Sequence, residues 1–93
     1  MIVSIRHKGL RLLWEKGDAS KLPAAQVPKL LFILDTLDTM VSLEPLASLA
    51  SLRLHPLTGM YKGFWSLHVS GNYRVIFVYD EGDVYLVNYL DYH

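Results

Sequence analysis

Five residues in the second half of the chain are of the types that move protons or hold phosphate. His55 lies in LHPLTG, Arg74 lies in the apolar segment YRVIFVY, and the sequence closes on Asp91, Tyr92 and His93. Histidine exchanges protons near neutral pH, and the arginine fork fits phosphate oxygens. Cleavage of RNA by its own 2′-hydroxyl needs a base, an acid and a cation for the charge on the phosphorane. These residue types therefore suit metal-independent phosphodiester cleavage.

The same residues have structural interpretations that spacing alone leaves open. His55 precedes a proline and fits an ordinary loop, while Tyr92 and His93 are terminal residues of the kind that often fray. Arg74 has fewer alternatives, because burying an unpaired arginine within a strand is costly. It must either face a cleft or pair with an acid, for which Asp91 is the first candidate.

The distribution of charge favours a phosphate-binding face, although the formal net charge of the 93 residues is zero. No acidic residue occurs in residues 45–79, a stretch that holds three cationic residues and two histidines. A locally positive face attracts phosphate even when the whole chain is neutral, although such a distribution also arises by chance. We name Arg53, Lys62 and His68 as candidate RNA ligands, with ordinary packed or solvated side chains as the alternative.

Composition places the chain among small folded proteins. Its length suits one domain, residues 1–93, and 52% of the residues are hydrophobic against 19% charged. There is no cysteine, and no histidines or carboxylates have ligand spacing, so we expect no metal and no other cofactor. The longest apolar run, 30–34, is too short to span a membrane, and no signal-peptide pattern is present. We therefore expect a cytoplasmic protein without membrane contact.

The first half of the chain predicts a short strand and two helices. Residues 2–6 alternate between apolar and polar types, which indicates a strand. The spacing of Leu10 and Leu13 predicts a helix that stops at Gly17. A second helix follows, with Pro28 tolerated in or near its first turn. Its apolar stripe consists of Val27, Leu30, Leu31, Leu34 and Leu37.

Beyond residue 51 the pattern changes to that of strands. Residues 41–51 form a connection with a short helical turn after Pro45, and a brief strand is predicted at 52–54. Longer strands, joined by the turn sequences SGN and DEG, are predicted at 64–69, 73–79 and 83–90. The resulting order is βααββββ. We therefore predict an α+β fold in which two N-terminal helices pack on a twisted, largely antiparallel sheet.

The segment from residue 54 to 93 resembles the second half of HigB-type toxins of the RelE superfamily. The shared pattern is L-H-P-L, a glycine, a Trp-Ser strand, a strand with an aromatic-Arg pair, a Gly-Asp turn and a terminal D-Y-H. The first half, with IRHKGLRLLWEKG and a helix ending near LDTLDT, is also similar, so the resemblance covers nearly the whole chain. It implies a RelE-like fold.

The resemblance also implies an activity and partners. Proteins of this family are ribosome-dependent endoribonucleases that cut messenger RNA and inhibit translation. Their partner is a HigA-type antitoxin with a helix-turn-helix, through which the toxin reaches operator DNA only indirectly. By position, His55, Arg74, Asp91, Tyr92 and His93 match the residues that look catalytic in the family.

One departure from the family pattern bears on RNA binding. Many HigB sequences have lysine where Thr58 stands, and Lys62 in the same loop compensates for that lost cation only in part. The departure favours one alternative hypothesis, a decayed toxin that serves only as a corepressor bound to its antitoxin. The runner-up to the endoribonuclease hypothesis is a ParE-like inhibitor of DNA gyrase, which shares the fold. His55 and the terminal Tyr92-His93 argue against it, because binding gyrase requires no proton-transfer residues.

Overall fold

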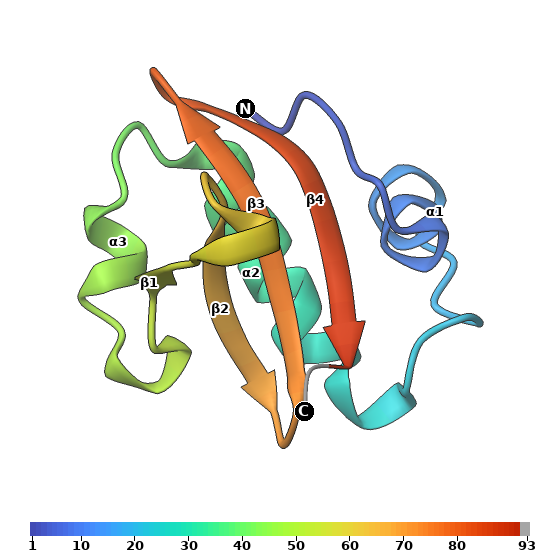
Figure 1. Ribbon diagram of the computed structural model, residues 1–93. Coiled ribbons are helices and arrows are strands. Elements are labelled where there is room, and N and C mark those ends of the chain that lie inside the picture. Colours follow the sequence, from blue (N-terminus) through green and yellow to red (C-terminus); the bar gives the residue numbers. More distant parts are fainter. Residues whose placement is uncertain (92–93) are drawn as a thin grey trace.

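The helices and strands follow the apolar pattern of the chain, of which the computed structural model describes residues 1–91 (Figure 1). The helices are α1 (Lys8–Lys16), α2 (Val27–Thr39) and α3 (Glu44–Ala47), and the strands are β1 (His55–Pro56), β2 (Trp65–Ser70), β3 (Tyr73–Asp80) and β4 (Asp83–Asp91). Short 3-10 turns lie between them at η1 (Ala24–Gln26), η2 (Ala50–Leu52) and η3 (Gly59–Tyr61). None of the helices in residues 1–91 has the length and apolar character needed to cross a membrane. The predicted α+β class is confirmed, with a four-stranded antiparallel sheet.

Local capping sets the two ends of α1. The ring of His7 accepts the Leu10 N–H at Nδ1 (3.2 Å), which satisfies an amide that would otherwise be unpaired. Burial lowers the pKa of His7 and so favours the neutral ring that this bond requires. At the other end Gly17 adopts the left-handed conformation, with φ of 69°, and its N–H bonds back to carbonyls of the last turn. The helix therefore stops at the glycine that predicted its end.

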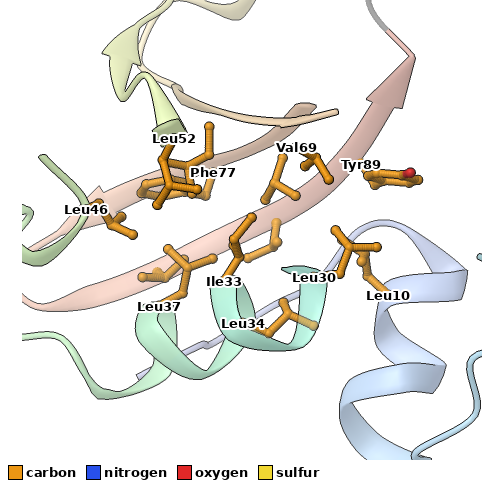
Figure 2. Close-up of a cluster of buried hydrophobic side chains, with 14 of the residues drawn as sticks. Leu10, Leu30, Ile33, Leu34, Leu37, Leu46, Leu52, Val69, Phe77 and Tyr89 are labelled. Atoms are coloured by element: carbon orange, nitrogen blue, oxygen red, sulfur yellow. The ribbon is translucent and has the colours of Figure 1, made fainter. Parts of the chain in front are cut away.

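One side of α2 closes one face of the sheet. Four of its residues are buried: Leu30, Ile33, Leu34 and Leu37. Figure 2 shows Ile33 and Leu37 on the side of the helix toward the strands. The predicted stripe was wrong at Leu31, which is 38% exposed, while Ile33 takes a place in the core. Successive helical residues differ by about 100° around the axis, so Leu31 turns away from the face on which Leu30 lies. Pro28 stands in the first turn of α2, as predicted.

The sheet has the order β1-β2-β3-β4 and two unlike faces. In Figure 1, α2 lies behind the sheet, and the segment after β1, drawn in yellow, crosses in front of β3. Side chains alternate between the faces of a strand. Val75 and Phe77 of β3 accordingly join the core with α2, while Arg74 and Ile76 lie on the opposite face beside a cavity.

A bulge in β4 decides which of its residues reach each face. The β3–β4 register shifts by one residue near Leu86, whose φ is 56°. As a consequence Val84 and Val87, three positions apart, both enter the core. Beyond the bulge, Leu90 lies opposite Arg74. The bulge therefore sets the register of the strand end that approaches Arg74.

The predicted first strand is only partly formed. Residues 2–6 make isolated parallel bridges to β4, in which Ile2 pairs with Val84 and Ile5 with Val87. The Ile2 N–H, on the edge away from β4, is donated to the carboxylate of Asp38 on α2 (3.0 Å). The segment is therefore held by scattered bonds to two elements and does not form a regular ladder.

The predicted strand at 52–54 was wrong. Leu52 ends the 3-10 turn η2, and Arg53 follows in the left-handed conformation with φ of 49°. Such a conformation reverses the direction of the chain, so extended backbone begins only at His55. The order βααββββ is therefore wrong in its first and fourth elements, whereas the helical turn at Pro45 is present in α3.

Packing between α2 and the sheet predicts a clear difference between two neighbouring leucines. Leu34→Ala should lower the free energy of unfolding by about 3 kcal/mol, because Leu34 is completely buried and its truncation leaves a cavity. Leu31→Ala, on the same helix but 38% exposed, should cost less than about 1 kcal/mol. Urea unfolding followed by circular dichroism measures both, and equal losses would contradict this assignment of the buried face.

Candidate functional site

The face of the sheet opposite α2 gathers polar side chains from three strands. The register pairs His55 of β1 with Ser66 of β2, and Ser66 in turn with Ile76 of β3. Farther along, His68 of β2 lies opposite Arg74 of β3. Directly paired residues of an antiparallel sheet lie on the same face. Two histidines and the arginine therefore share the face that α2 does not cover.

A cavity of about 100 Å³ opens on this face. It is lined by His55, Leu57, Ser66, Arg74, Ile76 and Leu90. The lining thus brings together two of the predicted catalytic residues, with no carboxylate among the lining residues from the described part of the chain. A guanidinium in such surroundings attracts anions, because no acid in the lining offsets its charge.

Within residues 1–91, Arg74 is an unpaired cation. Its Nη1 is buried and has no hydrogen-bond partner within residues 1–91. No ion pair in that range includes Arg74, and the register sets Asp91 opposite Tyr73 and not opposite Arg74. Of the two interpretations left open by the sequence, a position beside a cleft is the one observed. A buried guanidinium donor without a partner is costly, which suits a site that an anion completes.

A backbone carbonyl fixes the ring of His55. Nδ1 of His55 lies 2.8 Å from the carbonyl oxygen of Arg53. Since a carbonyl can only accept, Nδ1 carries a proton, and Nε2 is the nitrogen left to exchange one with a substrate. The left-handed conformation of Arg53 turns this carbonyl toward the ring. His55 is exposed, so a substrate can reach it.

The three candidate RNA ligands come from segments that border the cavity without lining it. Arg53 is exposed and lies directly before β1. Lys62 is exposed at the end of η3, in the segment that crosses the sheet in Figure 1. Nε2 of His68 lies 3.1 Å from the Gly71 carbonyl oxygen, so the imidazole is engaged in the β2–β3 turn. Arg53 and Lys62 are therefore exposed cations on neighbouring segments, the imidazole of His68 is engaged, and none of the three lines the cavity.

The structure does not bring Asp91 into the cavity. Asp91 pairs with Tyr73, which shares its face with Val75 and the core. By register its side chain therefore belongs to the α2 face and not to that of Arg74. The predicted catalytic residues Tyr92 and His93 lie outside the described residues.

Tyr89 anchors the end of β4 that carries Asp91. Its ring stacks on Tyr73 with centroids 5.2 Å apart and meets His7 edge-on at 5.4 Å. Its hydroxyl donates to the side-chain oxygen of Gln26. Burial, then the nearby Tyr73 and Asp91, raises the pKa of Tyr89 to about 12, so the phenol stays protonated at neutral pH. These contacts hold the end of β4 against His7, directly before α1, and against Gln26, directly before α2.

Ser66 is a site residue that the sequence did not single out. In WSLHVS it alternates with apolar neighbours, as a solvent-facing serine of any half-buried strand would. The structure instead buries it completely beside His55 and Arg74. Burial of this face depends on the segment that folds over β3, which local periodicity does not report.

Two solved structures share this fold at low sequence identity. The crystal structure of YafQ from E. coli strain BL21(DE3) matches with a TM-score of 0.58 and 17% identity, covering 92% of this chain and 89% of that one. A mutant of YafQ from E. coli gives a TM-score of 0.55 and 18% identity with the same coverage. At these identities the likeness supports the fold alone.

Sequence comparison identifies the family. The Endoribonuclease HigB of Proteus vulgaris is 43% identical over 93 residues and is covered, like this chain, along its whole length. A family model described as the RelE-like toxin of the type II toxin-antitoxin system HigB matches residues 3–93. These matches confirm the resemblance seen in LHPLTG and in the final strands: the chain belongs to the HigB-like family of type II toxin–antitoxin toxins.

Proposed function

We propose that this chain is an endoribonuclease toxin that cuts messenger RNA on the ribosome without a metal ion. Membership of the HigB-like family and 43% identity to an endoribonuclease over the whole chain support the activity class. The observation that carries the proposal is the unpartnered Nη1 of Arg74 beside His55 in one cavity without a lining carboxylate. Within residues 1–91 no group of three or more potential ligands could hold a metal ion.

In the proposed reaction, Nε2 of His55 accepts the proton of the RNA 2′-hydroxyl. The 2′ oxygen then attacks the adjacent phosphorus, and the bond to the 5′ oxygen of the next nucleotide breaks. Arg74 donates to a non-bridging oxygen and balances the charge that develops on the phosphorane. We assign protonation of the leaving oxygen to Tyr92 or His93 on the family resemblance. Asp91, on the other face by register, would act by positioning this end of the chain.

RNA binding in this proposal depends on local charge. Arg53 and Lys62 are exposed on the segments that border the cavity, and His68 lies opposite Arg74 on the same face. We propose that these residues contact phosphates on either side of the scissile bond. Contacts of this kind add affinity without reading sequence, because the phosphate backbone is uniform.

A toxin of a type II system has an antitoxin partner. We propose that this antitoxin is of the HigA type, with a helix-turn-helix that binds operator DNA, so that the toxin reaches DNA only through it. The remaining partner is the ribosome with its mRNA, which places the protein in the cytoplasm. Membranes play no part in this proposal.

The products distinguish this mechanism from hydrolysis. Ribosomes programmed with one mRNA should yield fragments with 2′,3′-cyclic or 3′ phosphates and 5′-hydroxyl ends, because the 2′-hydroxyl is the nucleophile. Cleavage should also proceed in EDTA at concentrations that the ribosome itself tolerates, because residues 1–91 hold no group of three or more potential metal ligands. Ligation of the 5′ ends of the fragments, with and without prior phosphorylation, shows whether those ends carry a hydroxyl or a phosphate. Products with 3′-hydroxyl ends would contradict the mechanism, and altered plasmid supercoiling without mRNA cleavage would favour the ParE-like alternative.

Arg74→Ala should reduce ribosome-dependent cleavage by about 100-fold or more, because the cation that balances the phosphorane is lost. Its fold should persist, since no hydrogen bond of Nη1 is broken within residues 1–91. Arg6→Ala removes the same charge at an exposed position outside the cavity lining and should leave cleavage near wild type. Single-turnover cleavage and far-UV circular dichroism are measured together. Unfolding of Arg74→Ala would show that the arginine has a structural role.

Thr58→Lys should increase RNA binding and cleavage by restoring the cation common in the family. Thr58 is exposed and its side chain makes no capping bond to η3, so the replacement breaks no contact of this kind. One added phosphate contact should steepen the dependence of log affinity on log salt by about 1. Val41→Lys, at a residue 86% exposed and outside the cavity lining, adds the same charge as a control. Equal effects of the two lysines would assign the gain to net charge alone.

A further inference from the structure

Ser66 is a buried hydroxyl without a hydrogen-bond partner. Ser66 is 0% exposed. Its neighbours on β2 are the apolar Trp65 and Leu67. Within residues 1–91 its Oγ makes no hydrogen bond. Most buried polar atoms in proteins are paired, so an exception within residues 1–91 marks a position at which a bound ligand can supply the hydrogen bond.

The position of Ser66 shows where such a partner would lie. Ser66 lines the cavity together with His55 and Arg74. On β2 it lies directly between His55 of β1 and Ile76 of β3. Nη1 of Arg74 is likewise buried and unpartnered. Ser66 and Arg74, whose Oγ and Nη1 are unpaired within residues 1–91, thus line the same space of about 100 Å³, which is large enough to admit a small polar group.

The chemistry of these two groups favours an anion over a neutral guest. Arg74 can only donate, and the Ser66 hydroxyl can donate as well, so both are satisfied by an acceptor oxygen. A water would satisfy the hydrogen bonds but would leave the guanidinium charge uncompensated. The rest of the lining includes the apolar Leu57, Ile76 and Leu90, which exclude water and strengthen an ionic hydrogen bond.

We propose that Ser66 is a substrate-binding residue that donates a hydrogen bond to a non-bridging oxygen of the phosphate held by Arg74. Together the two side chains form an anion-binding pair beside Nε2 of His55. The identification of that anion as the scissile phosphodiester rests on the proposed function. Binding of phosphate itself does not, because it requires only the two donors and the cavity.

Inorganic phosphate tests the pair without a ribosome. Titration of the purified toxin, followed by ³¹P NMR and thermal unfolding, should show saturable binding. Ser66→Ala should weaken that binding about tenfold or more, the usual effect of losing a hydrogen bond to a charged group. Ser66→Thr keeps the hydroxyl and should retain most of the affinity, whereas Arg74→Ala should abolish binding. Ser70→Ala, at an exposed serine of the same strand, is the matched control.

Stability and cleavage separate the remaining explanations. Ser66→Ala should fold at least as stably as wild type, because it removes a buried hydroxyl that has no partner in residues 1–91. Its ribosome-dependent cleavage should fall about tenfold or more, with recovery in Ser66→Thr. Wild-type phosphate affinity in Ser66→Ala, or no phosphate binding by the wild type, overturns the inference whatever the RNA assay gives. Phosphate binding that depends on both residues, without any RNA cleavage, supports the anion site and overturns the proposed function.

Discussion

A charged guanidinium on an inner strand is the constraint on which the arrangement of this site depends. Arg74 lies on β3, which has hydrogen-bonded neighbours on both sides and so cannot carry its charge to an edge. The next residue, Val75, packs into the core with Phe77 and fixes the backbone. Alternation then sends Arg74 to the opposite face. No ion pair within residues 1–91 includes it, and on that face it lines the cavity beside His55.

Regular spacing explains which elements could be predicted from the sequence. The helix α2 and the hairpins of β2, β3 and β4 repeat apolar residues at periods that only one conformation satisfies. Prediction failed where one residue bends the backbone. Arg53 and Leu86 adopt left-handed φ angles of 49° and 56°, which are uncommon without glycine, so nothing in their types announces the bend. Leu31 was misplaced because a stripe drawn on leucines alone is wider than the face that meets the sheet.

The candidate site was predictable by residue type but not by register. His55 and Arg74 stood out as polar residues in apolar or proline-punctuated surroundings, and both line the cavity. The face occupied by Asp91 depends on the extra residue of the bulge near Leu86. Without that residue, Asp91 would fall on the face of Arg74, where the ion pair considered from sequence could form. Ser66 was missed for the complementary reason, since its burial depends on a segment that crosses the sheet from elsewhere.

The acids of this chain, whose net charge is zero, lie outside residues 45–79 and outside the described lining of the cavity. Two carboxylates hold the N-terminal segment: Asp38 accepts the Ile2 N–H, and Asp83 lies 3.7 Å from the terminal ammonium group of Met1. In Figure 1 that terminus lies near the end of the sheet where β3 turns into β4. Charges separated by more than a Debye length of about 8 Å are largely screened. Under the proposed function, an approaching phosphate would therefore respond to the charges closest to the cavity, whose lining contains no carboxylate within residues 1–91, more than to the net charge of the chain. Under the proposed function, threonine in place of lysine at position 58 would therefore weaken RNA binding more than the zero net charge does.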